Sequence, residues 1–329
     1  MGSKTVLKNE KSSMGRKSLS SLSVIIPCEP GGDPGACLDA LRALGPQEKG
    51  LIKEVLVAWG RHPSLQRNLA VLKARSPWVL FLDADSRVQP GALSALLAAA
   101  SQPQVAAAGG PNLPLPNEPP LGLAFDRVLA SFAGSMRSRA RYAPVGRRRP
   151  CGEKELILCN LLVRREAFVA AGGFREDLYP NEENELFNRL QADGWELVYE
   201  PAAQVRRPRR DTVAAFVAQA FRYGRGRTQQ MRRNFFPSDL VNLLPLALPL
   251  AWALVLASAL HVSHAWALPL LYAAGCWLAM GMRVPSAFFL ALRHHAYAAG
   301  LLTGFFQDAP GRDRQVRLQA VALRRKGRR

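Results

Sequence analysis

The sequence predicts an α/β protein in which a mostly parallel, doubly wound sheet is followed by a transmembrane helical hairpin. Short apolar runs alternate with helical patterns between residues 22 and 100, which is typical of such a sheet. The third of these runs ends in two carboxylates, Asp83 and Asp85. Residues 240–282 contain no Asp, Glu, Lys or Arg, which indicates a membrane segment.

The elements of the sheet follow one another in order. The apolar run at residues 22–27 predicts a first buried strand, and residues 36–44 carry apolar side chains at helical spacing. A second strand is expected at residues 54–58, a second helix at residues 65–74 and a third strand at residues 79–82. No Gly-x-Gly-x-x-Gly follows the first strand and no P-loop pattern occurs, which argues against dinucleotide-binding and P-loop proteins.

Asp83 and Asp85 follow the third strand, at the edge where open α/β sheets bind their ligands. An isolated Asp-x-Asp often does no more than cap a helix or a turn. Here the pair lies between a buried strand and a helix expected at residues 90–100, with Pro90 near its first turn. Two carboxylates in this place can hold a divalent metal ion against a nucleotide diphosphate.

The chain of 329 residues is strongly basic, with a formal net charge of +19 from 44 Lys and Arg against 25 Asp and Glu. Such a protein should have an anionic partner, either nucleic acid or membrane lipid. Its apolar content of 48% is ample for a core and excludes general disorder. The basic residues gather around apolar segments, which favours membrane lipid and argues against nucleic acid.

Residues 239–283 are expected to form the transmembrane hairpin. As one helix, the uncharged stretch would be about 65 Å long, roughly twice the thickness of the hydrocarbon core. Two spans that reverse near residues 261–264 satisfy this length, and neither half has the polar face that a soluble helix pair needs. Residues 284–307 are apolar but interrupted by Arg293 and two histidines, so an interfacial or a third membrane helix is expected there.

The flanks of the hairpin indicate its orientation. Basic clusters at residues 206–233 and 312–329 surround the apolar segments, as the positive-inside rule expects when both ends are cytoplasmic. Residues 1–21 lack the apolar region of a signal peptide, and the five cysteines show no Cys-x-x-Cys spacing. The protein is therefore expected at a bacterial inner (cytoplasmic) membrane, with its α/β domain on the cytoplasmic side.

The expected organisation is a disordered basic tail (1–21), an α/β domain (22–205), a basic interfacial helical segment (206–238), the hairpin (239–283), the interfacial or third membrane helix (284–307) and a basic cytoplasmic tail (308–329). The arginines just before the hairpin are assigned mainly to anionic lipid headgroups; they are Arg206, Arg207, Arg209, Arg210, Arg225 and Arg227.

Three later motifs accompany the Asp-Ala-Asp motif of residues 83–85 in order and spacing. They are the stretch of residues 159–175, the run Asn181-Glu182-Glu183-Asn184-Glu185, and residues 219–223, which read Gln-Ala-Phe-Arg-Tyr. Together they resemble a membrane-associated family 2 glycosyltransferase of the GT-A fold. The second run resembles the Glu-Asp motif of that family, and the third its Gln-x-x-Arg-Trp motif. The Asn-Glu-x-Asn-Glu version resembles the succinoglycan-type enzymes that extend lipid-linked oligosaccharides.

The resemblance implies an inverting enzyme that displaces a nucleoside diphosphate from a sugar. Asp85, assisted by Asp83, is expected to hold Mg²⁺ or Mn²⁺. Glu183 is expected to be the general base, with Glu182 as the second catalytic carboxylate; the alternative is a merely acidic first helical turn. The residues expected to bind the nucleotide-sugar donor or the acceptor are Pro27, Glu29, Trp59, Arg67, Asn68, Asp83, Asn160, Gln219, Arg222 and Tyr223.

Two departures from the family pattern leave the nucleotide open. The second strand ends in Trp59 and Gly60, without the acidic residues that usually bind uracil, so Trp59 is a candidate to stack on a base. The first strand ends without the usual Asn-Glu pair, which Glu29 can replace.

The predicted function is transfer of a sugar from a nucleotide-sugar donor to a lipid-linked saccharide acceptor, in the synthesis of a cell-surface polysaccharide or glycolipid. Two alternatives stay open. One is a polyprenyl-phosphate sugar synthase, whose phosphate acceptor needs little deprotonation. The other is a catalytically silent membrane scaffold that keeps the fold.

Overall fold

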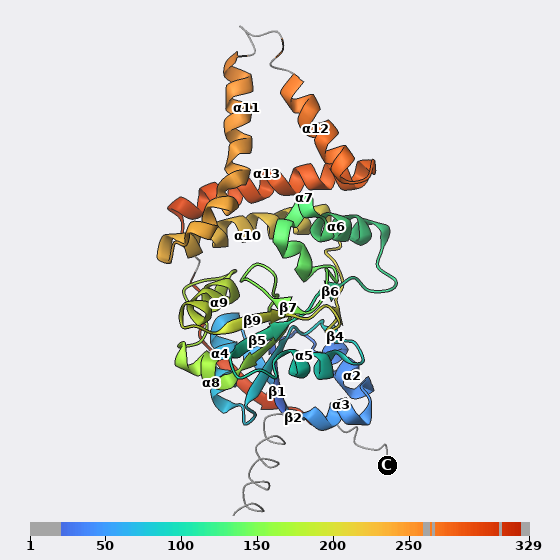
Figure 1. The fold of residues 1–329 in the computed structure, drawn as a ribbon, viewed down its shortest axis with the longest axis vertical. Helices are drawn as coiled ribbons and strands as arrows, with labels where there is room; N and C mark the ends of the chain where they lie inside the picture. The colour runs from blue at the N-terminus through green and yellow to red at the C-terminus, as the bar shows by residue number, and fades with distance from the viewer. Residues whose placement is uncertain (1–20, 259–263, 265–266, 309–310, 324–329) are drawn as a thin grey trace, which may run out of the picture.

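The computed structural model describes residues 21–258, 264, 267–308 and 311–323. An α/β domain lies at one end of the molecule, a layer of long helices covers one side of it, and a pair of helices projects from that layer (Figure 1). Residues 1–20 of the expected basic tail and most of the expected reversal at 261–264 lie outside the described residues.

A sheet of eight strands, in the order β11-β2-β1-β3-β8-β5-β9-β7, forms the α/β domain. Its strands are β1 (Leu22–Cys28), β2 (Ile52–Gly60), β3 (Trp78–Leu82), β5 (Val105–Gly109), β7 (Arg149–Pro150), β8 (Asn160–Arg164), β9 (Glu196–Tyr199) and β11 (Val316–Ala320). A second sheet has the order β4-β10-β6, with β4 (Arg87–Val88), β6 (Asn112–Leu113) and β10 (Val205–Arg206). Since β1 pairs in parallel with β2 and β3, these three strands end at one edge.

The strands predicted at residues 22–27, 54–58 and 79–82 are confirmed as β1, β2 and β3. The sheet is more mixed than predicted, because β8 runs antiparallel to β3 and β5, and β11 runs antiparallel to β2. β11 also corrects the prediction that residues 308–329 are only a tail. Its five residues, Val-Arg-Leu-Gln-Ala, are too short and polar a run to mark a strand in the sequence.

The helices are α2 (Gly35–Ala43), α3 (Pro46–Leu51), α4 (Pro63–Lys73), α5 (Ala92–Ala99), α6 (Pro120–Ala130), α7 (Phe132–Ser135), η1 (Met136–Arg141), α8 (Arg165–Ala170), α9 (Glu182–Ala192), α10 (Val213–Arg233), η2 (Pro237–Leu246), α11 (Ala247–Ser258), α12 (Ala267–Ala279) and α13 (Val284–Phe306). The helices predicted at residues 36–44, 65–74 and 90–100 are confirmed as α2, α4 and α5. His62 caps the start of α4, because its ring accepts a hydrogen bond from the Leu65 amide.

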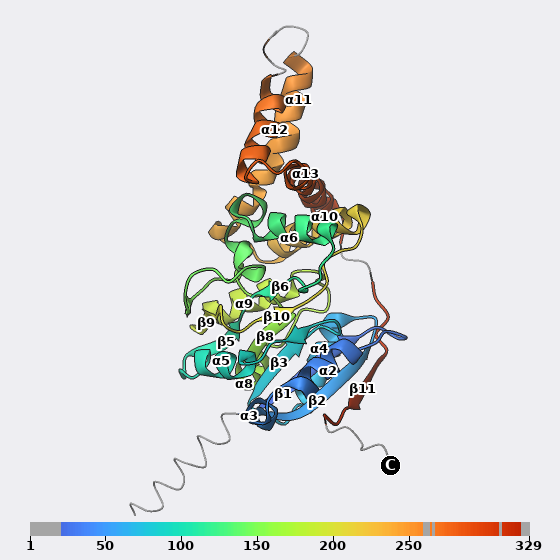
Figure 2. The ribbon, with the colours of Figure 1, turned by 90° about the vertical axis from the view of Figure 1, so that its right-hand side faces the viewer.

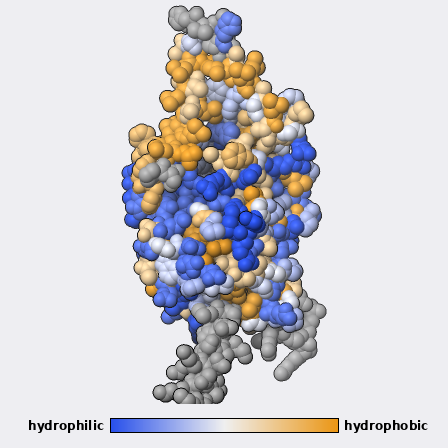
Figure 3. Space-filling view, viewed as in Figure 1, coloured by the Kyte–Doolittle hydropathy of each residue, from blue (hydrophilic) through white to orange (hydrophobic). Residues whose placement is uncertain are grey.

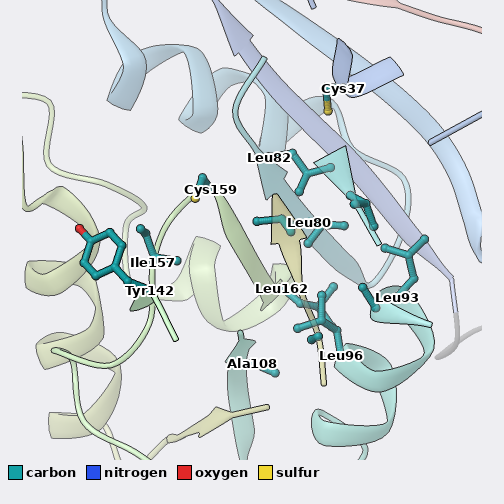
Figure 4. Packing of buried hydrophobic residues seen from close by; sticks show 14 of the residues in the cluster. Cys37, Leu80, Leu82, Leu93, Leu96, Ala108, Tyr142, Ile157, Cys159 and Leu162 are labelled. Carbon is teal, nitrogen blue, oxygen red and sulfur yellow. The ribbon is translucent and has the colours of Figure 1, made fainter. Parts of the chain in front are cut away.

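Alternate residues of β1 pack on opposite faces of the sheet, as a strand buried on both faces requires. Val24 and Ile26 belong to one apolar cluster with α2 and α5, and Ile25 belongs to a second cluster with α4, α8 and α9. Figure 4 shows side chains of β3 packed beside those of β8 and α5 in the first cluster. This packing fixes the end of β3, and with it the turn that carries Asp83.

α10 and α13 form the helical layer and pack side by side. A Cβ at Gly224 would overlap the carbonyl oxygen of Tyr297, and one at Gly300 would overlap that of Phe221, so both glycines are needed for this close approach. α11 and α12 project from the layer on the side away from the sheet (Figures 1 and 2). Apolar residues cover these two helices in Figure 3, whereas hydrophilic residues predominate over much of the α/β domain.

Among the described residues, one unbroken helical segment, Asp239–Ser258, is long and apolar enough to cross a membrane, with a mean hydropathy of 2.1. α12 and α13 are long and apolar enough only when they are taken together, and the chain bends by 120° between them. α13 therefore lies across the projecting helices and does not continue them.

Candidate active site

Asp83 and Asp85 lie in a tight turn directly after β3. The Ser86 amide donates to the Asp83 carbonyl oxygen (2.9 Å), and the Asp83 amide donates to the Ser86 hydroxyl (3.1 Å). That hydroxyl donates in turn to the carbonyl oxygen of Cys159, next to β8 (3.3 Å). The turn is thus tied to the neighbouring strand, and it holds both carboxylates at the edge of the sheet where such folds bind ligands.

Arg207, just after β10, binds both carboxylates. Its Nε and Nη2 donate to the two oxygens of Asp85 (2.7 and 3.1 Å), and its Nη1 lies 2.8 Å from Asp83 Oδ2. The assignment of Arg207 to lipid headgroups was therefore wrong. β10 pairs with β4, which closely follows the Asp85 turn, and this pairing brings Arg207 into the site.

Arg67 of α4 joins Asp83 to a second acidic group. Its buried guanidinium lies 3.1 Å from Asp83 Oδ1 and 3.2 Å from Glu182 Oε1. Burial alone would raise the pKa of Asp83, but the charges of Arg207 and Arg67 together hold that pKa below its usual value. Asp83 is therefore ionised at neutral pH, with one arginine at each carboxylate oxygen.

Glu182 and Glu183 begin α9, after Asn181 turns the chain with a φ of 85°. The Glu182 side chain is 3% exposed, and burial, followed by the charge of Glu183, raises its pKa to about 8. The Glu183 side chain is 12% exposed and lies 3.6 Å from Nη1 of Arg141. The more exposed Glu183 is therefore the better placed of the two to accept a proton from a bound acceptor.

Arg141, at the end of η1, is a site residue that no motif in the sequence predicts. This buried side chain donates to Asn184 Oδ1 (2.5 Å) and to the carbonyl oxygen of Glu153 (2.9 Å), besides its ion pair with Glu183. It therefore fixes the start of α9 against the loop that carries Glu153. Nothing in the sequence separates Arg141 from the other basic residues around it.

The Gln-Ala-Phe-Arg-Tyr run lies on α10, beside the start of α9. Asn181 Nδ2 donates to the carbonyl oxygen of Tyr223 (3.5 Å), and Gln219 Nε2 donates to the Tyr223 hydroxyl (3.2 Å). Burial raises the pKa of Tyr223, and the nearby charge of Glu183 adds to that rise. Gln219 and Tyr223 thus lie on the Glu183 side of the site, whereas Arg222 is exposed.

Two residues expected to bind the donor form other contacts. The Asn68 amide group bonds to the Phe174 carbonyl oxygen (2.8 Å) and amide (2.9 Å). Asn160 Nδ2 donates to the carbonyl oxygen of Ala203 (2.7 Å). Both side chains are used to hold backbone segments together, which differs from the donor-binding role expected for them.

Pro27, Glu29 and Trp59 lie at or just beyond the ends of β1 and β2. Trp59 is not brought to Asp83 directly, because β1 separates β2 from β3, whereas Pro27 and Glu29 lie at the end of β1, the strand that pairs with β3. The Trp59 indole donates to Gln319 Oε1 of β11 (3.0 Å). These residues form a second region of the same sheet edge.

Three more arginines assigned to lipid headgroups contact protein groups instead: Arg206 donates to the Pro114 carbonyl oxygen, Arg209 pairs with Asp126, and Arg227 pairs with Glu153. The assignment was wrong for these residues because the fold buries carboxylates and carbonyl oxygens beside this basic run. A cluster of arginines in the sequence does not show which members face solvent.

The fold and the site together define a glycosyltransferase of the GT-A type, with a carboxylate pair after β3 and a second acidic pair at the start of α9. The chain belongs to the glycosyl transferase family group 2, whose family model matches residues 78–304. The succinoglycan biosynthesis protein ExoA of Rhizobium meliloti (strain 1021) is 30% identical over 322 residues, covering 86% of this chain and 94% of that protein.

Two solved structures are similar to this chain. The mannosyltransferase PcManGT from Pyrobaculum calidifontis, in complex with GDP-Man and Mn²⁺, matches with a TM-score of 0.53 and 18% identity, over 87% of each chain. GalNAc-T7 with UDP, GalNAc and Mn²⁺ matches with a TM-score of 0.43 and 12% identity, over 67% of this chain and 52% of the other. The likeness to PcManGT shows a shared fold.

Proposed function

We propose that the chain is an inverting glycosyltransferase that moves a sugar from a nucleotide-sugar donor to a lipid-linked saccharide acceptor at a bacterial inner membrane. The observation that carries this proposal is the position of Arg67. It contacts both Asp83 and Glu182, so the turn after β3 and the acidic start of α9 form one site. The name of the relative, a succinoglycan biosynthesis protein, supports a polysaccharide product.

Asp83 and Asp85 fit a divalent cation. Mg²⁺ commonly binds one or two carboxylates together with substrate phosphates. In the part of the chain that the structure describes, no group of three or more His, Cys, Asp or Glu side chains could hold an ion, so the oxygens of a donor diphosphate would complete the ligand set. The bound ion would neutralise charge on the leaving diphosphate. The Mn²⁺ in PcManGT supports this assignment.

Glu183 is the proposed base. The acceptor hydroxyl attacks the anomeric carbon, the bond from that carbon to the diphosphate oxygen breaks, and the hydroxyl proton passes to the Glu183 carboxylate. Attack opposite the leaving group inverts the anomeric centre. Arg141 holds Glu183 in place, while burial raises the pKa of Glu182 and so favours its protonated form.

The proposed acceptor is lipid-linked because the helical layer connects the site to the apolar helices. α10 carries Gln219 and Tyr223 beside the start of α9, and its other neighbour is α13, from which α11 and α12 project. A saccharide whose lipid lies in the bilayer would reach Glu183 from this side. In this scheme residues 22–205, completed by Arg207 and β11, form the catalytic domain, 206–238 the interfacial segment and 239–283 the hairpin.

Thermal unfolding of the detergent-solubilised chain tests the donor class. We expect one of UDP, GDP and ADP, with Mn²⁺ or Mg²⁺, to raise the melting temperature, because a ligand that binds only the native state adds about 2.7 kcal/mol at 100 times its Kd. The same nucleotide without metal should raise the melting temperature less. If none of the three nucleotides has an effect, the proposed donor class is wrong.

Reporter fusions test the orientation in the membrane. Fusions at residue 20 and at residue 329 should report a cytoplasmic position, and a fusion near residue 261 a periplasmic one, since basic clusters flank the hairpin. The pairing of β11 with β2 gives an independent reason, because it requires the chain after α13 to lie on the same side as the sheet. A periplasmic signal at residue 329 would contradict both arguments.

A further inference from the structure

The C-terminal segment forms one wall of a cavity at the carboxyl ends of β1 and β2. The cavity has a volume of about 570 Å³. Residues 30–32, after β1, and 59–61, at the end of β2, line one side; Asp313 and residues 315–317 line the other. No motif in the sequence pointed to a role for these C-terminal residues in the site.

Strand pairing fixes this wall in place. In the antiparallel register, Val316 lies opposite Gly60 and Arg317 lies opposite Trp59. Figure 2 shows β11 alongside β2 at the edge of the sheet. The two backbones approach so closely that a Cβ at Gly60 would lie 2.7 Å from the carbonyl oxygen of Gln315. The C-terminal segment is therefore a fitted part of the sheet.

Side chains before β11 anchor the segment to the rest of the domain. The Arg312 guanidinium lies 3.9 Å from the centre of the Tyr179 ring, and Arg314 pairs with Glu176 at 2.5 Å. Arg317, in contrast, is exposed, and its guanidinium lies 5.9 Å from the centre of the Trp59 ring. The cavity thus has an aromatic ring and a planar cation on adjacent strands.

The cavity lies at the distance from the carboxylate turn that a nucleotide requires. β1 separates β2 from β3, so the ends of β2 and β3 are about 10 Å apart, two strand spacings. The ribose and phosphates of a nucleoside diphosphate can span that distance. With its diphosphate at Asp83 and Asp85, its nucleoside would reach the cavity.

We propose that residues 313–317 form the outer wall of the pocket for the donor's nucleoside, an inference that rests on the proposed function. The base stacks against Trp59 and the guanidinium of Arg317, since both present planar surfaces that attract nucleobases. Asp313 accepts a bond from the Gln315 amide through Oδ1 (3.0 Å), and its Oδ2 can accept an N–H of the base or a ribose hydroxyl. Donor binding then requires the segment that returns from the membrane helices.

Isothermal titration of the full-length protein in detergent tests this pocket. The probes are UDP, GDP and ADP, each with Mn²⁺, and pyrophosphate with Mn²⁺, which has the phosphates but no nucleoside. We expect Arg317→Ala to weaken binding of the preferred nucleoside diphosphate about tenfold, the effect of losing one stacking partner, and to leave pyrophosphate binding within about twofold. Arg75→Ala is the control, because Arg75 is an exposed arginine before β3 that pairs with Glu54 and does not line the cavity; it should change neither affinity.

Two results would contradict the proposed nucleoside pocket. One is unchanged nucleotide affinity in Arg317→Ala; the other is an equal loss for nucleotide and pyrophosphate, which would place Arg317 at the phosphates. Failure of the wild type to bind any of the three nucleotides would instead contradict the proposed function. If Arg317→Ala does not fold, Arg317→Lys serves, because it keeps the charge and lacks the planar guanidinium; the same selective loss is expected.

Discussion

Replacing Asp85 by Asn is expected to lower sugar transfer by about 10³-fold and to abolish metal-dependent nucleotide binding. The amide keeps the shape of the side chain but removes the negative charge that would hold a divalent ion. Stabilisation of leaving-group charge by a metal contributes several kcal/mol, and each factor of ten corresponds to about 1.4 kcal/mol. The variant should fold, because the Asp85 side chain is 44% exposed at the end of a strand. Transfer assays and titration of the preferred nucleotide with and without Mn²⁺ measure the two effects.

Arg207→Gln is the control for this variant, since Asp85→Asn also breaks the ion pair between these residues. Arg207→Gln breaks the same pair and keeps both carboxylates, so metal-dependent binding should persist. Binding of Mn²⁺ without nucleotide should become tighter, because the guanidinium no longer competes for the oxygens of Asp83 and Asp85. If Asp85→Asn binds nucleotide with the same metal dependence as the wild type, Asp85 is not the metal ligand.

The first half of the sheet could be predicted because each of its signals is local. β1, β2 and β3 are short apolar runs separated by amphipathic helices, and such a pattern identifies parallel strands buried on both faces. β11 could not be predicted in this way. It is the edge strand of the sheet and pairs only with β2, three of its five residues are exposed, and the run has the composition of a polar tail.

The carboxylates of the site could be predicted from the sequence, but their partners could not. Asp83 and Glu182 stand in recognisable motifs, and the structure brings them to opposite sides of one guanidinium, that of Arg67. Arg207 lies in a basic run whose members look alike in the sequence. Only the pairing of β10 with β4 determines that Arg207 faces the carboxylates. Long-range strand pairing thus determines which charged side chains form ion pairs, and this pairing cannot be read from the composition of the sequence.

Glu183→Gln is expected to lower sugar transfer by about 10² to 10⁴-fold, the range lost when general-base catalysis is removed. Glutamine keeps the size and hydrogen bonding of the side chain but cannot accept the acceptor's proton. Donor binding should stay near that of the wild type, because Glu183 pairs with Arg141, whereas the proposed donor-binding residues Arg67 and Asp83 pair with each other. Single-turnover transfer and nucleotide titration separate the chemical step from binding.

Glu182→Gln is the decisive comparison, because the two glutamates are neighbours that differ in exposure and in their arginine partners. Burial raises the pKa of Glu182 and favours the protonated form that glutamine imitates, so transfer should fall much less than in Glu183→Gln. Glu185 pairs with Arg189 at 2.6 Å, so Glu185→Gln should lower the melting temperature more than the rate. Full activity of Glu183→Gln, with the loss confined to Glu182→Gln or Glu185→Gln, would move the base to that neighbour. Normal activity in all three variants would mean that the acceptor needs no deprotonation, which is the behaviour of a phosphate and would identify the chain as a polyprenyl-phosphate sugar synthase.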